Sequence, residues 1–211
     1  MIRIMLVDDH AVVRVGFRML LQASDSSIEV VAEADSGEAA LQLLPTVQPD
    51  VLLLDLSMPG MGGLETVRRL RAHDPAIKVL VLSAHEDTAH ARRALGAGAL
   101  GYLSKRSAPE ALVQAVRCVA TGKRYIDAAL AQKLALAQLG DEPNPVEALS
   151  EREFSVFVQL ARGATVAAIA EQLALSGSTV GTHLYHIKQK LGAANQAELT
   201  LIALRWGVIE A

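Results

Sequence analysis

The sequence predicts a doubly wound α/β domain with a five-stranded parallel sheet, followed by a small all-helical domain. Up to residue 124, short apolar runs alternate with segments of helical periodicity, and the run VLLL at 51–54 is apolar throughout, which is typical of a strand buried on both faces. After residue 148, helical segments follow one another without a strand. The stretch GDEPNP at 140–145 has the composition of a linker. We therefore expect three parts: 1–124, a linker with a helix over 125–147, and 148–211.

The expected elements of the first domain alternate strictly along the chain. Strands are predicted at Ile2–Val7, Ile28–Ala34, Val51–Leu54, Lys78–Leu82 and Ala99–Leu103. Helices are predicted at Ala11–Gln22, Glu38–Leu44, Leu64–His73, Asp87–Gly96 and Glu110–Thr121. A further helix is predicted within Arg124–Leu139, with Asp127 as its cap.

Composition narrows the class of protein. The chain has 211 residues with a net charge of −3, and no run approaches the ~18 apolar residues of a membrane span. Its first residues, MIRIMLVDDH, lack the apolar stretch of a signal peptide. The single cysteine, Cys118, excludes an intrachain disulfide and is interpreted as a packing residue. We expect a cytoplasmic protein without a membrane partner.

Polar residues stand where the predicted strands end. Asp8 and Asp9 follow the first strand, and Asp55, Ser83 and Lys105 follow the third, fourth and fifth. In a parallel sheet these ends share one edge, where ligands bind. Three carboxylates placed together repel one another unless a divalent cation lies among them, and oxygen ligands suit Mg²⁺. Because a lysine and a hydroxyl can stabilise phosphoryl oxygens, the pattern predicts an aspartate that accepts a phosphoryl group.

Each of these residues also has a simpler interpretation. Asp55 or Ser83 could cap a helix, the paired aspartates could belong to a solvated loop, and Lys105 could be a surface charge. Their occurrence together at successive strand ends favours the phosphoryl site. A phosphatase with an aspartate nucleophile is a further alternative, but that chemistry usually needs a second acid where Ser57 stands. We expect a protein that is not an enzyme.

The first domain resembles the receiver domain of two-component response regulators. The matching motifs are LVDDH at 6–10, DLSMPGMGGLE at 55–65, LSAH at 82–85 and GYLSK at 101–105. The resemblance implies a flavodoxin-like sheet with strand order 2-1-3-4-5 and Asp55 as the phosphoacceptor. The implied Mg²⁺ ligands are Asp8, Asp9, Asp55 and, through its backbone carbonyl, Ser57. Ser83 and Lys105 would contact the phosphoryl group.

Tyr102 matches the switch aromatic of the receiver family. Phosphorylation would add charge and acceptor oxygens at the sheet edge, and Ser83 could move toward them. Tyr102 could then rotate into the vacated space, so that the face near the fourth and fifth strands changes shape and favours a dimer or releases the second domain. Ordinary core packing of Tyr102 is the alternative.

The second domain is predicted to contain four helices. Ser150 and Glu153 form a capping box that opens the first, which extends to Arg162. The next are expected at Val166–Ala174, Thr179–Leu191 and Gln196–Trp206, with a turn at Ser176–Ser178. In the third, one apolar stripe is formed by Val180, Leu184, Ile187 and Leu191. Two helices joined by a tight turn, the second with a polar face, fit a helix-turn-helix, and a protein-docking bundle is the alternative.

LSEREFSVFVQLARG at 149–163 and IAEQLALSGSTVGTHLYHIKQKLG at 169–192 resemble the LuxR/NarL-type DNA-binding domain, so the whole chain resembles a NarL-family response regulator. RYIDAALAQKLAL at 124–136 and ELTLIALRWG at 198–207 further resemble the GacA/UvrY group. The implied partners are a sensor histidine kinase, double-stranded promoter DNA and a second copy of the chain after phosphorylation, with RNA polymerase as a further possible partner. The DNA-facing candidates are Gly181, Thr182, Tyr185, His186, Lys188 and Lys190.

The second domain departs from this family in its charge. Basic residues are common in the family where Gly181 and Tyr185 stand, and Arg is usual at the position of Gln196. Residues 148–211 hold five Lys/Arg and five Asp/Glu, so the domain has no net charge. Each lost phosphate contact lowers the log–log salt slope by about 0.9. We expect weak DNA binding with a shallow salt dependence, strengthened by dimers that span two half-sites about one helical turn apart.

Overall fold

The structure, a computed structural model, describes residues 1–84, 87–137 and 144–209. It divides into two compact units, each described here by itself: Met1–Glu86 with Ala91–Lys133, and Asp87–His90 with Leu134–Ala211. Three sequence predictions fall partly outside the described residues, one of them the helix predicted within Arg124–Leu139, which is described only to residue 137. The other two are motifs. They are the GDEPNP linker, of which only 144–145 are described, and the LSAH motif, whose last residue is 85.

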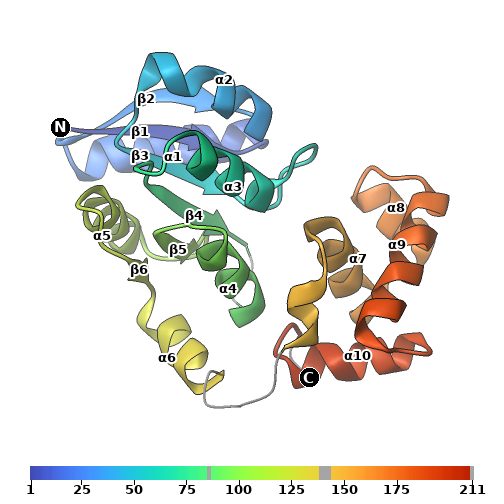
Figure 1. Cartoon of the computed structure of the whole chain (residues 1–211). Helices are drawn as coiled ribbons and strands as arrows, with labels where there is room; N and C mark the ends of the chain where they lie inside the picture. The colour runs from blue at the N-terminus through green and yellow to red at the C-terminus, as the bar shows by residue number, and fades with distance from the viewer. Residues whose placement is uncertain (85–86, 138–143, 210–211) are drawn as a thin grey trace. The chain divides into compact units, whose positions relative to one another are not determined.

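The first unit is a parallel sheet with helices on both faces (Figure 1). Its strands are β1 (Ile2–Val7), β2 (Ile28–Ala34), β3 (Val51–Asp55), β4 (Val79–Ser83), β5 (Gly101–Ser104) and β6 (Tyr125–Ile126). Its helices are α1 (Ala11–Ser24), α2 (Gly37–Val47), α3 (Gly63–His73), α4 (Thr88–Gly96) and α5 (Pro109–Ala120), of which α4 spans both groupings, and α6 (Ala128–Ala137) follows the sheet. The strand order is β2-β1-β3-β4-β5-β6, so the predicted order 2-1-3-4-5 is confirmed.

All five predicted strands are present, and the sheet has one further short strand at its edge. β6 pairs in parallel with β5, with Tyr125 opposite Gly101 and Ile126 opposite Tyr102. These residues lie in the stretch predicted to contain a helix, just ahead of its predicted cap, and no strand was expected there. An aromatic and a β-branched residue suit the open edge of β5. Asp127 caps α6 as expected, since its Oδ1 accepts from the backbone N–H of Ala129 at 2.9 Å.

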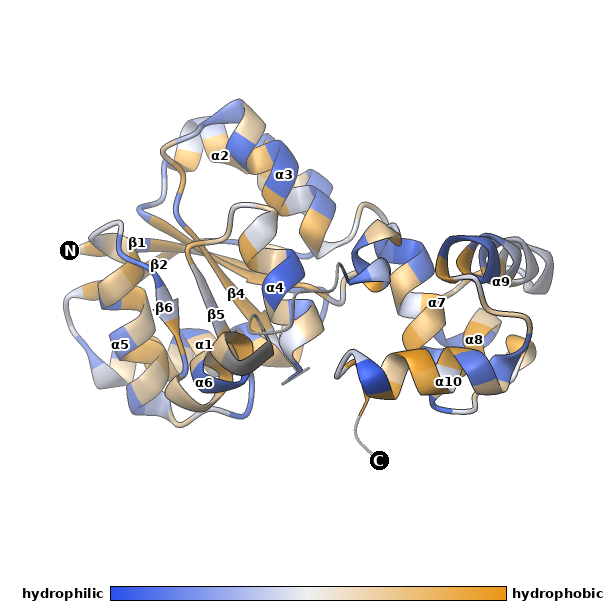
Figure 2. Ribbon diagram, turned by 60° about the horizontal axis from the view of Figure 1, so that its bottom comes forward, coloured by the Kyte–Doolittle hydropathy of each residue, from blue (hydrophilic) through white to orange (hydrophobic). Residues whose placement is uncertain are grey.

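Continuous burial explains why β3 and β4 are apolar runs in the sequence. α1 and α5 cover one face of the sheet, and α2, α3 and α4 lie over the other (Figure 2). Leu53, Leu80 and Leu103 pack with Leu21 and Val116 on the first face, while the alternating residues of each strand face the second. Polar residues are therefore left to the strand ends, which is where the site lies.

The second unit is built from helices. Its elements are the 3-10 turn η1 (Pro145–Ala148), α7 (Glu151–Ala161), α8 (Val166–Gln172), α9 (Gly177–Leu191) and α10 (Gln196–Arg205). Phe157, Ile169, Val180, Ile187 and Leu199 are fully buried in its core. No helix in the described ranges is long and apolar enough to cross a membrane.

Two predictions about where helices of the second unit begin can be compared with the structure. The Ser150–Glu153 capping box is present at the start of α7. The predicted turn at Ser176–Ser178 was wrong, because α9 already begins at Gly177. Ser176 is its N-cap and accepts from the backbone N–H of Thr179 at 3.1 Å.

Candidate functional site: an acidic sheet edge and a recognition helix

The carboxyl edge of the sheet gathers the residues predicted from the strand ends. Val7 lies opposite Leu54, Asp55 opposite Leu82, and Ser83 opposite Ser104. The backbone N–H of Lys105 donates to the carbonyl of Ser83 at 2.8 Å, which fixes the end of β5 to the end of β4. We call this set the acidic edge: Asp8, Asp9, Asp55, Ser83 and Lys105.

Lys105 joins the two most buried carboxylates of the acidic edge. Its Nζ lies 2.6 Å from Oδ2 of Asp8 and 2.9 Å from Oδ2 of Asp55, whereas these aspartates are only 5% and 2% exposed. Burial raises the pKa of Asp55, and the ammonium of Lys105 opposes that shift. Burial alone would lower the pKa of Lys105, but its bond to Asp8 and the charge of Asp55 outweigh burial and raise it. Lys105 is therefore a cation at neutral pH.

One ammonium does not balance three carboxylates, and the remaining donor set fits a divalent cation. Asp8, Asp9, His10 and Asp55 each offer one ligand atom, and these atoms lie within 4.8 Å of one another. Oδ1 of Asp9 and Oδ1 of Asp55 are buried without a well-directed hydrogen bond from the described residues, whereas Oδ2 of Asp55 lies 2.9 Å from the ammonium of Lys105. Buried carboxylate oxygens left in this state are costly unless a cation binds them. His10 was not among the predicted ligands, although the motif LVDDH contains it.

The loop that follows Asp55 is held by close packing and by α2. A Cβ on Gly63 would lie 2.5 Å from the carbonyl oxygen of Asp55, so only glycine fits there. Glu38 accepts from the backbone N–H of Met61 at 3.0 Å. Ser57 is exposed in this loop, two residues after Asp55, and its carbonyl stays a predicted ligand. Glu38 was not predicted from the sequence, because its contact joins residues far apart in the chain.

Ser83 and Tyr102 lie inside the domain. Both residues are fully buried, and Tyr102 is the largest such side chain, opposite Val81 in the sheet register. Tyr102 is therefore packed inward here. A switch role would require it to leave this position, and that role stays a prediction.

On α9, the predicted DNA-facing residues fall into two groups. Tyr185 is 62% exposed, Thr182 and His186 are also exposed, and the rings of Tyr185 and His186 lie 5.8 Å apart. The second group is basic and bonded within the domain. Lys188 Nζ donates to the carbonyl of Ala194 at 3.0 Å, and Lys190 Nζ donates to Oε2 of Glu153 at 2.6 Å.

Gly181 is half-buried, and a Cβ at its position would meet no atom within 4 Å, so this glycine adds no contact of its own to the face of α9. The three exposed candidates outside the basic group are thus a phenol, a hydroxyl and an imidazole. Such groups reach base edges and phosphates by hydrogen bonding and apolar contact, with little electrostatic attraction.

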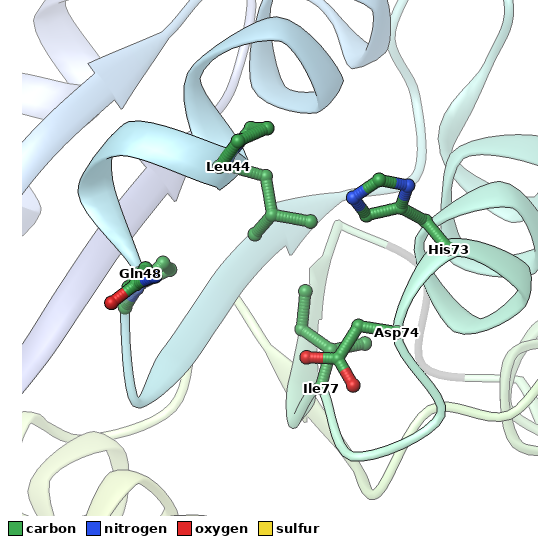
Figure 3. A pocket seen from close by; sticks show the side chains of 7 residues that line it. Leu44, Gln48, His73, Asp74 and Ile77 are labelled. Atoms are coloured by element: carbon green, nitrogen blue, oxygen red, sulfur yellow. The ribbon is translucent and has the colours of Figure 1, made fainter.

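The first unit also contains a separate pocket of about 320 Å³. It is formed by the C-terminal end of α2 with Gln48 and by the end of α3 with Ile77, and the side chains of His73 and Asp74 point toward it (Figure 3). Helices of a parallel α/β fold return to the amino ends of the strands, so this pocket is at the sheet edge opposite Asp55. It contains none of the predicted site residues.

Both halves of the chain match known families. Residues 4–117 match the response regulator receiver domain, and residues 147–203 match the bacterial regulatory proteins of the luxR family. The chain is 41% identical over 213 residues to the response regulator GacA of Pseudomonas aeruginosa, covering 100% of this chain and 99% of GacA. It is also 41% identical to the response regulator UvrY of Escherichia coli K12, with coverages of 100% and 97%.

A solved structure of RcsB from Salmonella enterica serovar Typhimurium, bound to promoter rprA in the presence of phosphomimetic BeF3−, is similar with a TM-score of 0.65 and 26% identity. The match covers 95% of this chain and 97% of that one. The expected similarity to the GacA/UvrY group is confirmed over the full length. The chain belongs to the two-component response regulators that carry a receiver domain and a LuxR-type DNA-binding domain.

Proposed function

We propose that Asp55 accepts a phosphoryl group from a sensor histidine kinase and that this modification controls dimerisation and sequence-specific binding to promoter DNA. The observation that supports it most is the contact of one lysine, Lys105, with both Asp8 and Asp55 at a buried sheet edge. This arrangement keeps a cation beside the carboxylate that would receive the phosphoryl group. We also propose a cytoplasmic location, because promoter DNA would be its binding partner.

The chemistry follows from the charges at the acidic edge. A carboxylate oxygen of Asp55 forms a bond to phosphorus while the bond between phosphorus and the kinase histidine breaks, and that histidine takes up a proton. Lys105 can turn from Asp55 toward the phosphoryl oxygens, because its second bond, to Asp8, holds it in place. Ser83 would donate its hydroxyl to another of these oxygens. Asp8, Asp9 and Asp55, with the Ser57 carbonyl, would hold Mg²⁺, which neutralises charge on the transferred group.

Phosphorylation would reach the second domain through the sheet edge. Ser83 and Tyr102 lie on neighbouring strands, β4 and β5, and both are buried in close-packed surroundings, so movement of Ser83 would allow the packing around Tyr102 to change. The resulting change favours a dimer that presents two copies of α9. Thr182, Tyr185 and His186 are the proposed contacts to DNA, with Gly181 allowing close approach and with Lys188 and Lys190 at the end of the helix.

The protein-docking alternative for the second domain is favoured by one observation, the internal bonding of both lysines of α9. The similarity to RcsB bound to promoter DNA favours DNA instead.

Phosphotransfer can be tested by intact-protein mass spectrometry with a small phosphodonor. Wild type should gain the mass of one phosphoryl group only when Mg²⁺ is present, and Asp55→Asn should gain none. Asp35→Asn is a matched control, because Asp35 is an exposed aspartate outside the acidic edge and this variant should behave as wild type. Modification of Asp55→Asn to the same extent as wild type would show that Asp55 is not the acceptor.

A further inference from the structure

His10 places a nitrogen donor against the acidic edge. Its Nδ1 lies 2.9 Å from Oδ1 of Asp9 and 3.3 Å from Oδ1 of Asp8. The backbone holds it there, because the N–H of His10 donates to Oδ1 of Asp8 at 2.8 Å. His10 is the N-cap residue of α1, yet its side chain makes no capping hydrogen bond, so the imidazole is not required by the helix.

The distances suit one shared metal ion. The ligand atoms of Asp8, Asp9, His10 and Asp55 lie within 4.8 Å of one another, on the scale of the ~4–5 Å that separates opposite ligands of one ion with bonds of roughly 2.0–2.6 Å. Asp55 gives an independent indication of a ligand, because it is 2% exposed and its Oδ1 is buried without a well-directed hydrogen-bond donor among the described residues, although Lys105 Nζ lies 2.9 Å from its Oδ2. The side chain of His10 is 65% exposed, so an arriving ion can reach it from solvent.

The combination of three carboxylates and one imidazole differs in chemistry from an all-oxygen site. Mg²⁺ prefers oxygen ligands and gains little from imidazole, whereas Zn²⁺ and Ni²⁺ accept imidazole well and bind a given mixed site more tightly. An imidazole that is already in contact with two of the carboxylates adds a ligand at a small ordering cost.

We propose that His10 is a fourth protein ligand that lets the phosphorylation site bind a divalent transition-metal ion, with Zn²⁺ as the representative, in competition with Mg²⁺. This inference rests on the proposed function, because it concerns the same site. If His10 acts in this way, phosphorylation of the receiver domain depends on the concentration of transition-metal ions. An ion held by His10 as well as by the carboxylates would take the place of the Mg²⁺ that phosphotransfer to Asp55 uses.

The test is isothermal titration calorimetry of the full chain, without a histidine tag, against zinc chloride and magnesium chloride separately. Cys118→Ser serves as the background, because the thiol of Cys118 is free and partly exposed and could bind zinc. His10→Gln is compared with His73→Gln, which removes an exposed histidine at the end of α3. His10→Gln should fold normally because the imidazole makes no capping bond, and circular dichroism checks this.

The background protein and His73→Gln should bind Zn²⁺ more tightly than Mg²⁺. His10→Gln should weaken Zn²⁺ binding by roughly 10-fold or more, the scale known for partners of metal sites, and leave Mg²⁺ binding unchanged. Equal Zn²⁺ affinity with and without His10, or equal loss for both ions, would overturn the inference. The titration with magnesium chloride tests the proposed function separately, because a failure of every variant to bind Mg²⁺ would count against the Mg²⁺ site itself.

Discussion

At the scale of single residues, the pKa values of two buried carboxylates, Asp55 and Glu153, are shifted in opposite directions. Asp55 has its pKa raised, chiefly by burial, so keeping it charged costs the folded protein free energy. Burial alone would also raise the pKa of Glu153, but hydrogen bonds from Lys190 and Ser150 outweigh it and lower the pKa. The two shifts differ because burial dominates at Asp55, whereas hydrogen bonds outweigh burial at Glu153.

Replacing Asp55 should therefore stabilise the metal-free fold. The folded state holds a proton on Asp55 more tightly than the unfolded chain, so its contribution to the free energy of unfolding falls as pH rises above the ordinary value of 3.8. Asp55→Asn lacks this loss and should have a higher Tm at pH 7 in the absence of divalent metal. Each 1 kcal/mol gained corresponds to roughly 2–4 °C for a chain of this size.

The measurement is the Tm of wild type and Asp55→Asn between pH 4 and pH 7, with the exposed Asp35→Asn as control. The Tm values of wild type and Asp55→Asn should converge as the pH falls toward 4, and Asp35→Asn should follow wild type at every pH. A Tm for Asp55→Asn at pH 7 that is equal to or below that of wild type would contradict this electrostatic account.

Replacing Lys190 should destabilise the second domain. Lys190→Met leaves Glu153, which is 5% exposed, without its cation, and we expect a cost of about 1–2 kcal/mol in urea unfolding at pH 7. Because the pKa of Glu153 is lowered, this contribution is present above its ordinary value of 4.5 and is lost as pH falls through the lowered pKa. The difference between the proteins should shrink below that pH.

DNA binding by Lys190→Met distinguishes the two roles of this lysine. If Lys190 pairs with Glu153 and not with DNA, the log–log salt slope of DNA binding should be the same in wild type and Lys190→Met. A slope that falls by about 0.9 would instead identify Lys190 as a phosphate contact.

At the scale of elements, most of the fold was predictable from the sequence because burial on both faces requires continuous apolar runs in the inner strands. β6 was missed, since two residues are too few to show a period and depend on the edge of β5. The start of α9 was missed because serine is common both in turns and at helix caps, so Ser176 did not distinguish them. The strand-end residues were predictable from topology, whereas the contacts of His10, Glu38 and Glu153 depend on tertiary packing.

The surface of α9 can be altered without disturbing the core. Gly181 lies within the helix with open space around a Cβ position, so Gly181→Ala should stabilise the domain by up to ~1 kcal/mol. Gly181→Lys should give a similar gain and also steepen the log–log salt slope of DNA binding by about 0.9. Urea unfolding measures the first effect, and titrations at several salt concentrations measure the second. An unchanged slope in Gly181→Lys would mean that this face of α9 does not meet the phosphates.

At the scale of the whole molecule, a site on one unit would control a helix on the other. The acidic edge would receive the signal, and the dimer that presents α9 twice would deliver it to DNA. With no net charge on residues 148–211 and both α9 lysines bonded internally, a single domain should bind weakly. The proposed regulation through dimerisation would then be effective, because pairing two weak sites gains affinity without a new contact.

The most direct measurement is the affinity of wild type and Asp55→Asn for DNA selected from a random pool, with and without Mg²⁺ and a small phosphodonor. We expect the donor and Mg²⁺ together to tighten binding by wild type and to leave Asp55→Asn unchanged. A failure of both proteins to bind any DNA would favour the protein-docking alternative for the second domain. Equal binding by both proteins under all conditions would contradict the proposed control of DNA binding by Asp55.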